Sequence, residues 1–390
     1  MNSGLKGRIL AYWKKETVQV VAGILAFGSC FFVPPSMGYL EYINFKVLIL
    51  LFCLMSVVAG LKQIGVFDAL CRLVLQRVHS VRGVMLLLGS LSFFMSMFLT
   101  NDVTLVTVVP FTIMIFGSVA SFPLSMTLIL ETVAANLGSM LTPFGNPQNL
   151  FLYAEYEFGF VEFLEFMAPF TILSFLLVLV TGALLGKGEL RAANEDSGTQ
   201  GSPEDRNPGE EFLPSVRKKV ELCIYIALFV LSILAVARIL DVRILFALTL
   251  IAVGIMDYKL FSRVDYALLL TFVFFFIFVG NMGQMESVKT FLAGSMEGRE
   301  ILTAVLASQV ISNVPAAVLL AQFTDAGKEL VIGTNLGGLG TLIASMASLI
   351  TYKFYAEVEG CRKGNYLFLF TAVNVAFLLL LAMPLWLGSF

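Results

Sequence analysis

Polar residues interrupt this hydrophobic sequence at four places, which form two pairs. Residues 96–111 (SMFLTNDVTLVTVVPF) and 308–320 (SQVISNVPAAVLL) each place an Asn between two apolar segments. Each is followed by a Gly- and Asn-rich interruption, at 134–149 and 333–345. Lipid offers no hydrogen-bond partner to free backbone groups, so such interruptions are tolerated at membrane depth only where protein or water surrounds them. The paired interruptions therefore predict a binding site for a polar or ionic ligand inside a membrane protein.

The chemistry that these residues favour is ion binding. A half-helix that begins within the membrane presents free N–H groups to an anion, and one that ends there presents carbonyls to a cation. Amide and hydroxyl side chains add donors and acceptors, and glycines let backbone approach a ligand closely. Helix packing is the alternative role for each residue taken singly. The predicted binding residues are Thr100, Asn101, Asp102, Asn136, Thr142, Gly145, Asn146, Asn149, Ser312, Asn313, Thr334, Asn335, Gly337 and Thr341.

Two acids lie in apolar surroundings, Asp102 and Glu131. An acid at mid-membrane costs about 2.5–3.5 kcal/mol for Asp on insertion scales, which makes it a functional candidate. Asp102 is predicted to bind sodium or carry a proton, with helix capping as the alternative. Glu131 is predicted to line a cytoplasmic vestibule or take part in proton coupling. Transported sodium is expected near Asn101, Asp102 and Asn313. No Lys or Arg is predicted in the core, so a bound anion would need amides, hydroxyls, helix N-termini and a co-bound cation.

Composition sets the class of protein that must position these residues. The chain has 390 residues, of which 58% are hydrophobic and 13% charged, with a mean hydropathy of +0.90. This predicts an all-α polytopic membrane protein, because apolar stretches of about 20 residues cross a bilayer. The predicted uninterrupted spans are 17–34, 44–61, 163–185, 219–239, 243–257, 266–281 and 366–388.

Charge placement predicts the topology. With the N-terminus cytoplasmic, 19 of the 25 Lys and Arg residues fall on the inside, as cytoplasmic loops favour. This arrangement requires re-entrant hairpins at 84–120 and 301–323, whose arms of about 10–17 residues are too short for two ordinary spans. Broken helices at 124–151 and 329–351 then cross fully, which gives about nine full spans, two hairpins and an outside C-terminus.

The same topology divides the chain into two halves of opposite orientation. Residues 1–185 form the first half of the inverted repeat and residues 219–390 the second. Between them, 186–218 is rich in Gly, Ser, Pro and Glu and is predicted to be a flexible cytoplasmic linker.

Other motifs argue against enzymatic chemistry. The five cysteines show no paired ligand spacing, and neither an HExxH sequence nor a phosphate-binding GxxxxGK[ST] loop occurs. We therefore expect no enzyme activity, no resident cofactor or metal and no nucleic-acid partner. The expected partners are membrane lipid, a small anion and a coupling ion, either sodium or a proton.

A hairpin tip followed by GNPQN or GTNLGG resembles the ion-transporter superfamily. This superfamily includes divalent-anion/sodium symporters, citrate transporters, arsenite permeases and a sodium–proton antiporter branch. The resemblance covers about 17–388 apart from the linker, and it implies a homodimer whose protomers each move a transport part against a scaffold, like an elevator. In the symporter branch each tip carries Ser-Asn-Thr, which helps to bind sodium and the substrate carboxylate. Thr100-Asn101-Asp102 and Ser312-Asn313-Val314 keep the first two polar residues and depart at the third.

Together these observations predict a secondary active transporter of a small anion, either a carboxylate or an inorganic oxyanion, coupled to sodium or protons. A cation antiporter with Asp102 as the exchanging carboxylate, or an arsenite-type efflux permease, is the alternative on the same fold. A passive channel or a non-transporting membrane scaffold is the third hypothesis. The expected location is a bacterial inner (plasma) membrane.

Overall fold

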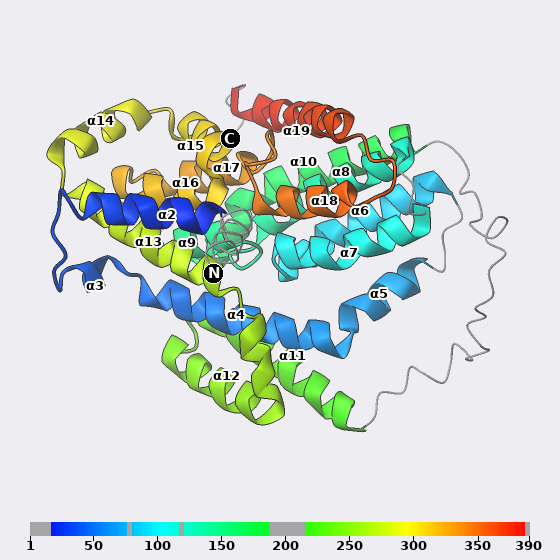
Figure 1. Ribbon diagram of the computed structural model, residues 1–390, viewed down its shortest axis with the longest axis horizontal. Coiled ribbons are helices and arrows are strands. Elements are labelled where there is room, and N and C mark those ends of the chain that lie inside the picture. Colours follow the sequence, from blue (N-terminus) through cyan, green and yellow to red (C-terminus); the bar gives the residue numbers. More distant parts are fainter. Residues whose placement is uncertain (1–16, 76–79, 117–120, 187–215, 387–390) are drawn as a thin grey trace, which may run out of the picture.

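The computed structural model describes residues 17–75, 80–116, 121–186 and 216–386 (Figure 1). These residues are almost entirely helical and form no β-strand, which confirms the predicted all-α class. The predicted linker lies almost entirely outside the described residues, and so do both chain ends, whose predicted sides of the membrane stay predictions.

The helices form two series, one before and one after the linker region. The first series is α2 (Thr17–Ser29), α3 (Tyr39–Tyr42), α4 (Phe45–Ile64), α5 (Val66–Leu75), α6 (Val81–Phe98), α7 (Asn101–Phe116), α8 (Phe122–Gly138), η1 (Ser139–Leu141), α9 (Pro147–Glu155) and α10 (Phe160–Leu185). The second series is α11 (Val216–Val236), α12 (Val242–Asp257), η2 (Tyr258–Arg263), α13 (Tyr266–Gly283), α14 (Glu286–Met296), α15 (Glu300–Ile311), α16 (Asn313–Leu320), η3 (Ala321–Phe323), α17 (Gly327–Leu336), α18 (Met346–Ala356) and α19 (Lys363–Trp386).

Eight segments of the described chain are long and apolar enough to cross a membrane. Six match uninterrupted spans predicted from the sequence, and a seventh, Phe122–Leu141, is the first part of a predicted broken helix. The eighth is α6, the first arm of the predicted first hairpin. Its 18 residues exceed the expected arm length, because the side chain of Ser80 caps the helix at 3.1 Å from the Gly83 amide and starts it before residue 84.

Each predicted hairpin is a pair of helices joined by a very short turn. In the first, α6 ends at Phe98 and α7 begins at Asn101. In the second, Ser312 alone separates α15 from α16, and its φ of 74° lies in a region that side chains other than glycine rarely adopt. Such strain persists only where surrounding structure holds it. That the hairpins re-enter one side of the membrane stays a prediction.

Both predicted broken helices are interrupted in the structure. The first has residues 142–146 between η1 and α9, and the second has residues 337–345 between α17 and α18. The chain resumes a helix at α9 because Asn146 caps it, accepting a hydrogen bond of 2.9 Å from the Asn149 amide, and Pro147 suits the first helical position. At both breaks, backbone carbonyls that lack a helical partner are bonded by side chains instead.

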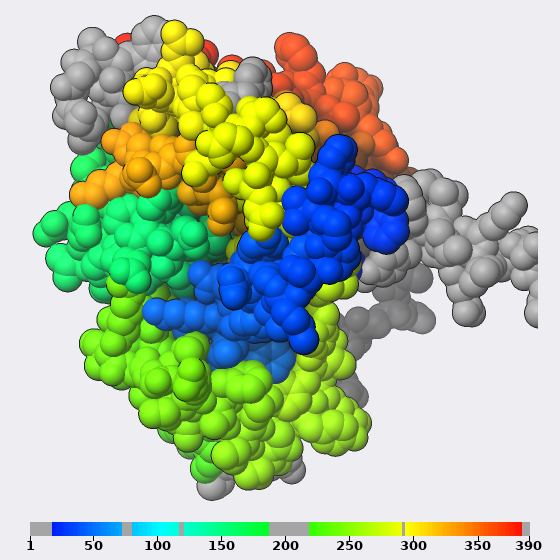
Figure 2. Space-filling model, turned by 90° about the vertical axis from the view of Figure 1, so that its left-hand side faces the viewer, coloured from blue at the N-terminus to red at the C-terminus, as the bar shows by residue number. Residues whose placement is uncertain are grey.

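Two groups of helices surround the breaks. Helices α4, α11 and α12 pack on one another below the rest of the molecule in Figure 1. Close contact at Gly60 supports this packing, since a Cβ there would lie 2.4 Å from the ring of Tyr225. Both hairpins and both broken helices lie above α4. In Figure 2 the blue α2–α4 segment crosses this face, with yellow and orange helices of the second half above it and yellow-green helices below it.

Packing between the halves is reciprocal. Helix α2 packs on α13, and α4 packs on α12. The second arm of each hairpin packs on the second part of the other half's broken helix, α7 on α18 and α16 on α9. These exchanged contacts are those that a repeat related by a two-fold axis would make.

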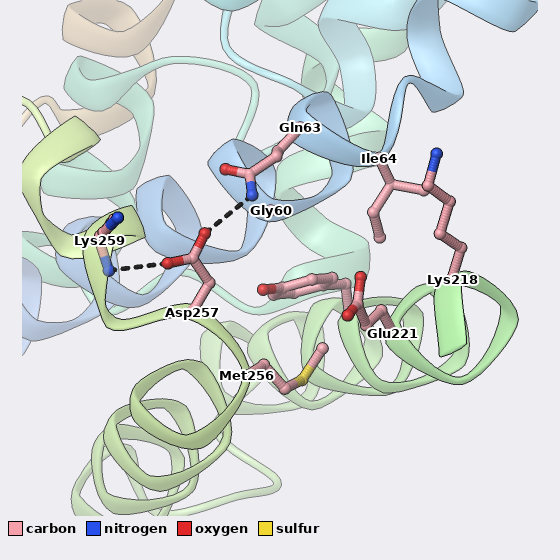
Figure 3. A pocket seen from close by; sticks show the side chains of 9 residues that line it. Gly60, Gln63, Ile64, Lys218, Glu221, Met256, Asp257 and Lys259 are labelled. Carbon is pink, nitrogen blue, oxygen red and sulfur yellow. Dashed lines mark hydrogen bonds between the residues drawn. The ribbon is translucent and has the colours of Figure 1, made fainter. Parts of the chain in front are cut away.

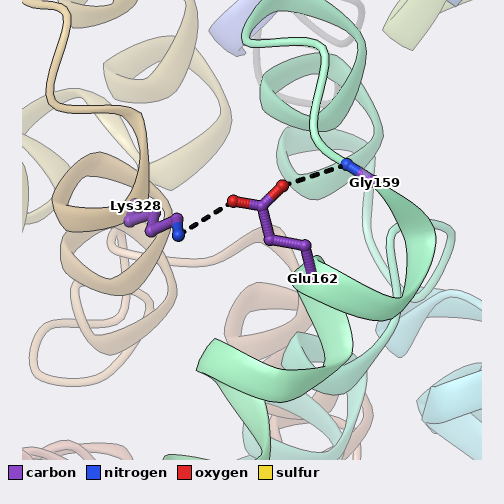
Figure 4. A network of polar contacts seen from close by, with 3 residues as sticks. All are labelled: Gly159, Glu162 and Lys328. Carbon is purple, nitrogen blue, oxygen red and sulfur yellow. Dashed lines mark hydrogen bonds and ion pairs between the residues drawn. The ribbon is translucent and has the colours of Figure 1, made fainter.

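An ion pair also joins the halves. The Lys328 Nζ, at the start of α17, lies 2.8 Å from Glu162 Oε1 of α10 (Figure 4). The other carboxylate oxygen of Glu162 accepts a hydrogen bond of 3.2 Å from the Gly159 amide. Both charged side chains are almost half exposed, so the ion pair contributes little to the free energy of folding.

Candidate functional site

The two helix breaks share one polar network, centred on a repeated asparagine. The Asn136 Oδ1 accepts hydrogen bonds of 2.9 Å from Asn101 Nδ2 and 3.0 Å from Ser345 Oγ. The Asn335 Oδ1 accepts one of 3.0 Å from Asn146 Nδ2. Asn146 and Ser345 each follow the repeated asparagine of their own half by ten residues. The far end of each break therefore donates to the asparagine of the other half.

Asn149 closes the first break. The Asn149 Oδ1 accepts a hydrogen bond of 2.6 Å from Asn335 Nδ2. The Asn149 Nδ2 donates to the Thr142 carbonyl oxygen at 3.1 Å. The same Nδ2 also reaches the carbonyl oxygens of Ser139 and Met140, at 3.4 and 3.2 Å. Carbonyls freed by the break are thus tied to a side chain that also bonds to the second half.

The hairpin tips contribute one asparagine each. Asn101 donates to the repeated Asn136, as described, and its Oδ1 accepts from the Asp102 amide at 3.0 Å. Asn313 sits differently, because its backbone amide donates to the Ala344 carbonyl at 3.0 Å. Its side-chain nitrogen would lie 3.1 Å from a Cβ at Gly338. Both tips therefore reach the breaks of their own half.

The predicted glycines act through close packing against protein. A Cβ at Gly145 would lie 2.1 Å from the Ser139 carbonyl oxygen, and one at Gly337 would lie 2.6 Å from Ser308 Oγ. Gly138, which corresponds to Gly337 in the repeat, would place a Cβ 2.0 Å from the Phe93 carbonyl oxygen. In each half a glycine thus lets the hairpin approach the break.

Thr142, Thr334 and Ser312 differ in which part of the structure their hydroxyls contact. The Thr142 Oγ1 donates to the Met97 carbonyl at 2.6 Å and so joins the first break to the first hairpin. Thr334 donates to the Leu330 carbonyl of its own helix at 2.8 Å, so the structure does not bring its hydroxyl to the tips. Ser312 is buried, and its Oγ lies 3.4 Å from the Ala344 carbonyl oxygen.

Gln309 is a residue that the sequence reasoning missed. Its Nε2 donates to the carbonyls of Gly337 and Leu339, both at 2.9 Å, and its Oε1 accepts from the Thr341 amide at 2.9 Å. The side chain therefore secures the second break as Asn149 secures the first. The available signal was a lone amide in the apolar arm, one helical turn before Asn313.

Asp102 faces a cavity of about 360 Å³. The cavity lies between α4, the tip of the first hairpin, the start of α9 and the turn before α13. The Oδ1 of the Asp102 carboxylate is buried without a hydrogen-bond partner. Thr100 caps α7 instead, since its Oγ1 accepts from the Val103 amide at 3.4 Å. The capping alternative for Asp102 is therefore not what the structure shows.

Charged residues also line this cavity. Lys62, Arg263 and Asp265 share its wall with Thr100 and Asp102. Lys62 is half-buried and Arg263 is exposed, and no Lys or Arg of the described residues is buried, as the sequence predicted; the end of α4 and η2 nevertheless bring both bases beside the hairpin tip. A smaller cavity of about 30 Å³ shares Thr100 and Pro147 with the first and extends to Asn146. The charged cavity thus leads toward the asparagine network.

Glu131 lies apart from this cavity. It is fully buried in α8, and its Oε1 accepts a short hydrogen bond from Thr112 Oγ1. Its Oε2 has no partner, and neither does the buried hydroxyl of Tyr366. Complete burial places Glu131 away from an open vestibule and leaves it as a buried acid between helices.

A further pocket of about 530 Å³ lies between the ends of α4, α11 and α12 (Figure 3). Its Asp257 accepts hydrogen bonds of 2.8 Å from Gln63 Nε2 and 3.0 Å from the Lys259 amide. None of the predicted binding residues lines it. It is a surface pocket of the lower helix group, separate from the asparagine network.

Eight apolar membrane-length segments around paired polar helix breaks define a polytopic membrane transporter. The chain belongs to the citrate transporter family, whose model matches residues 9–326. This agrees with the predicted resemblance to ion-transporter superfamily permeases.

Relatives with similar sequences are transporters or membrane proteins. An uncharacterised transporter of Methanocaldococcus jannaschii is 31% identical over 88% of this chain and 90% of its own length. The inner membrane protein YbiR of Escherichia coli is 31% identical over 85% of both chains. The silicon efflux transporter LSI3 of Oryza sativa is 32% identical over 33% of this chain and 26% of its own length.

Proposed function

We propose that the protein moves a small anion, a carboxylate or an inorganic oxyanion, by secondary active transport coupled to sodium or protons. The reciprocal asparagine network carries this proposal. It gathers donors and acceptors from both helix breaks at one place, and Asn136 Nδ2 and Asp102 Oδ1 remain buried there without partners. Buried polar atoms without partners are costly, so their retention favours a ligand that satisfies them during transport.

The two unpartnered atoms have different ligand preferences. An amide N–H donates and so suits an anion, whereas a carboxylate oxygen suits sodium or a proton. Sodium is proposed to bind near Asn101, Asp102 and Asn313, and the anion beside it. Glu131 is proposed to serve proton coupling, since it is the second buried acid with a free oxygen.

The proposed motion is elevator-like, within a homodimer in a bacterial inner membrane. Helices α4, α11 and α12 would form the scaffold, and the hairpins with the broken helices would form the transport part. Support comes from the separate packing of the α4 group and from the inner-membrane relative. Labelling of single cysteines at the two chain ends would test the proposed cytoplasmic N-terminus and external C-terminus.

Counterflow in proteoliposomes tests the anion proposal. Vesicles loaded with unlabelled citrate or phosphate should accumulate the same labelled anion when a sodium or proton gradient is present. Asn101→Ala should abolish this uptake. Asn374→Ala is the matched control: this buried amide donates to the Phe370 carbonyl at 2.8 Å within α19, and its unpartnered Oδ1 lies outside the hairpins and the breaks. Sodium-driven proton movement without anion exchange would overturn the proposal.

A cation antiporter or efflux permease is the second candidate. The unpartnered Oδ1 of Asp102 favours it, because cation exchange needs only a carboxylate that alternates between two ions. A relative is named a silicon efflux transporter, which shows that export occurs among similar proteins. In this case Asp102→Asn abolishes sodium–proton exchange, and no labelled anion moves in the wild type.

A further inference from the structure

Four charged residues line the cavity beside Asp102. Lys62, half-buried near the end of α4, and Arg263, exposed at the end of η2, line it together with Asp102 and Asp265. Its volume of about 360 Å³ falls within the range of small-molecule sites, about 300–1,000 Å³. The cavity therefore has room for a small polycarboxylate or oxyanion.

Neither basic side chain forms a close ion pair, although Asp68 acts electrostatically on Lys62 and Asp257 on Arg263. Within the described residues, the ion pair below 4.0 Å is Lys328 with Glu162, and neither Lys62 nor Arg263 has a carboxylate oxygen at that distance. Asp265 lines the cavity and also caps α13, since its Oδ1 accepts from the Leu268 amide at 2.9 Å. Two cations that share a cavity without paired carboxylates favour an anion between them.

The residue types fit this role. A guanidinium offers a planar pair of donors that matches a carboxylate or an oxyanion, and a lysine adds a compact charge on a long flexible stem. Thr100, at the hairpin tip, also lines the cavity and adds a hydroxyl. Lys62 and Arg263 come from the α4 group and its neighbouring turn, whereas Thr100 belongs to the first hairpin. A bound anion would thus contact both groups of helices.

We propose that Lys62 and Arg263 bind the transported anion in this cavity, and that the charge of Asp102 regulates the affinity. The proposal rests on the proposed anion transport and specifies its recognition site. With Asp102 ionised, two acids balance the two bases. Sodium or a proton at Asp102 leaves the cavity with one net positive charge, so the anion binds more tightly.

Linkage makes this effect reciprocal. If the cation raises anion affinity, the anion raises cation affinity by the same factor, and typical couplings are about 5- to 150-fold. Neither ligand then binds well alone. Coupled transport would follow from charge balance within one cavity, without a separate gate for each ligand.

Substitution of the two bases tests the site. Lys62→Gln and Arg263→Gln should each raise the KM for sodium-driven uptake of labelled citrate or phosphate about tenfold or more, with kcat less affected. Arg263→Lys keeps the charge without the planar donor pair and should lie between wild type and Arg263→Gln. The matched controls are Lys46→Gln, at the opposite end of α4, and Arg243→Gln, at the start of α12; both residues are exposed and neither lines the cavity.

Asp102→Asn gives a second, independent readout. In this variant citrate or phosphate should stabilise the purified protein against heat equally with and without sodium, whereas the wild type should need sodium. This binding measurement does not require transport activity.

The outcomes separate the two proposals. If the wild type exchanges anions but Lys62→Gln and Arg263→Gln match their controls, the cavity is not the anion site and the transport proposal survives. If the wild type exchanges no anion, both proposals fail together. Arg263 is exposed, so a folding defect should not obscure its variant; monodispersity in detergent checks this for each protein.

Discussion

The contact between the first hairpin and the first helix break can be tested at Gly138. A Cβ at this position would lie 2.0 Å from the Phe93 carbonyl oxygen and 2.6 Å from Ser96 Oγ. Real Cβ contacts essentially never fall below 3.0 Å, so α6 and α8 would have to separate by at least about 1.0 Å. The nearest obstacle is backbone, which cannot rotate away as a side chain can.

We therefore expect Gly138→Ala to destabilise the protein by about 1–3 kcal/mol through overpacking. Gly254→Ala in α12 is the matched control, because a Cβ there meets nothing within 4 Å. Alanine is the better helix former by about 0.5–1 kcal/mol, so the control should be neutral or stabilised. The two variants should differ by about 1.5–4 kcal/mol.

The assay is reversible unfolding in mixed micelles, with the free energy of unfolding followed by helical circular dichroism. Counterflow of labelled citrate or phosphate gives the functional readout, since displacement of α8 also moves Asn136 relative to Asn101. Equal unfolding free energies for Gly138→Ala and Gly254→Ala would refute the inferred close contact. If Gly138→Ala loses stability but transports fully, the contact is needed for packing and not for binding.

Three further variants probe the remaining contacts. Asn335→Ala leaves the buried Asn149 Oδ1 without its donor, so the free energy of unfolding in the same micelle assay should fall by about 1–3 kcal/mol. An unchanged free energy of unfolding would contradict the network. Glu131→Gln retains an acceptor for the threonine hydroxyl and should keep stability within about 1 kcal/mol, while proton-driven uptake falls; unchanged pH-gradient uptake argues against proton coupling there. Lys328→Ala should change the unfolding free energy by about 0–1 kcal/mol, since its pair with Glu162 is half exposed; a larger loss measured at high salt would show a packing role.

The sequence predicted the fold elements more completely than the cavity. Repeated asparagines at 136 and 335 identified both breaks, because an amide and glycines inside an apolar helix are a local signal. Ser345, which donates to Asn136, was not singled out, although its spacing of ten residues from Asn335 repeats that of Asn146 from Asn136. Serine is a common packing residue in membrane helices, so only the comparison of the two halves distinguishes it.

The charged cavity escaped sequence reasoning for a different reason. Lys62 and Arg263 flank apolar segments, where basic residues are expected at the membrane surface. Their long stems allow the charged groups to reach a site several ångströms from their own backbone. Only the fold shows that the end of α4 and the turn before α13 meet beside the first hairpin tip. Non-local proximity of this kind leaves no periodic trace in the sequence.

The exchanged hydrogen bonds between the halves constrain how the site can move. Asn136 accepts from Ser345 and Asn335 accepts from Asn146, so moving one break alone would leave buried amides unpaired in both. An additional bond of 2.9 Å joins Thr132 of α8 to Thr351 of α18. Both breaks are therefore expected to move as one rigid unit, against α4.

Cross-linking can test this rigid unit in a cysteine-free background. Thr132→Cys with Thr351→Cys links two parts of the unit and should leave counterflow intact. Val58→Cys with Val103→Cys lies across the cavity, between α4 and α7, and a thiol cross-linker that spans it should block transport. Reduction or omission of the linker is the control. If the first pair blocks counterflow as strongly as the second, the two breaks move relative to each other, and charge balance at Asp102 would have to be established within a site that rearranges during transport.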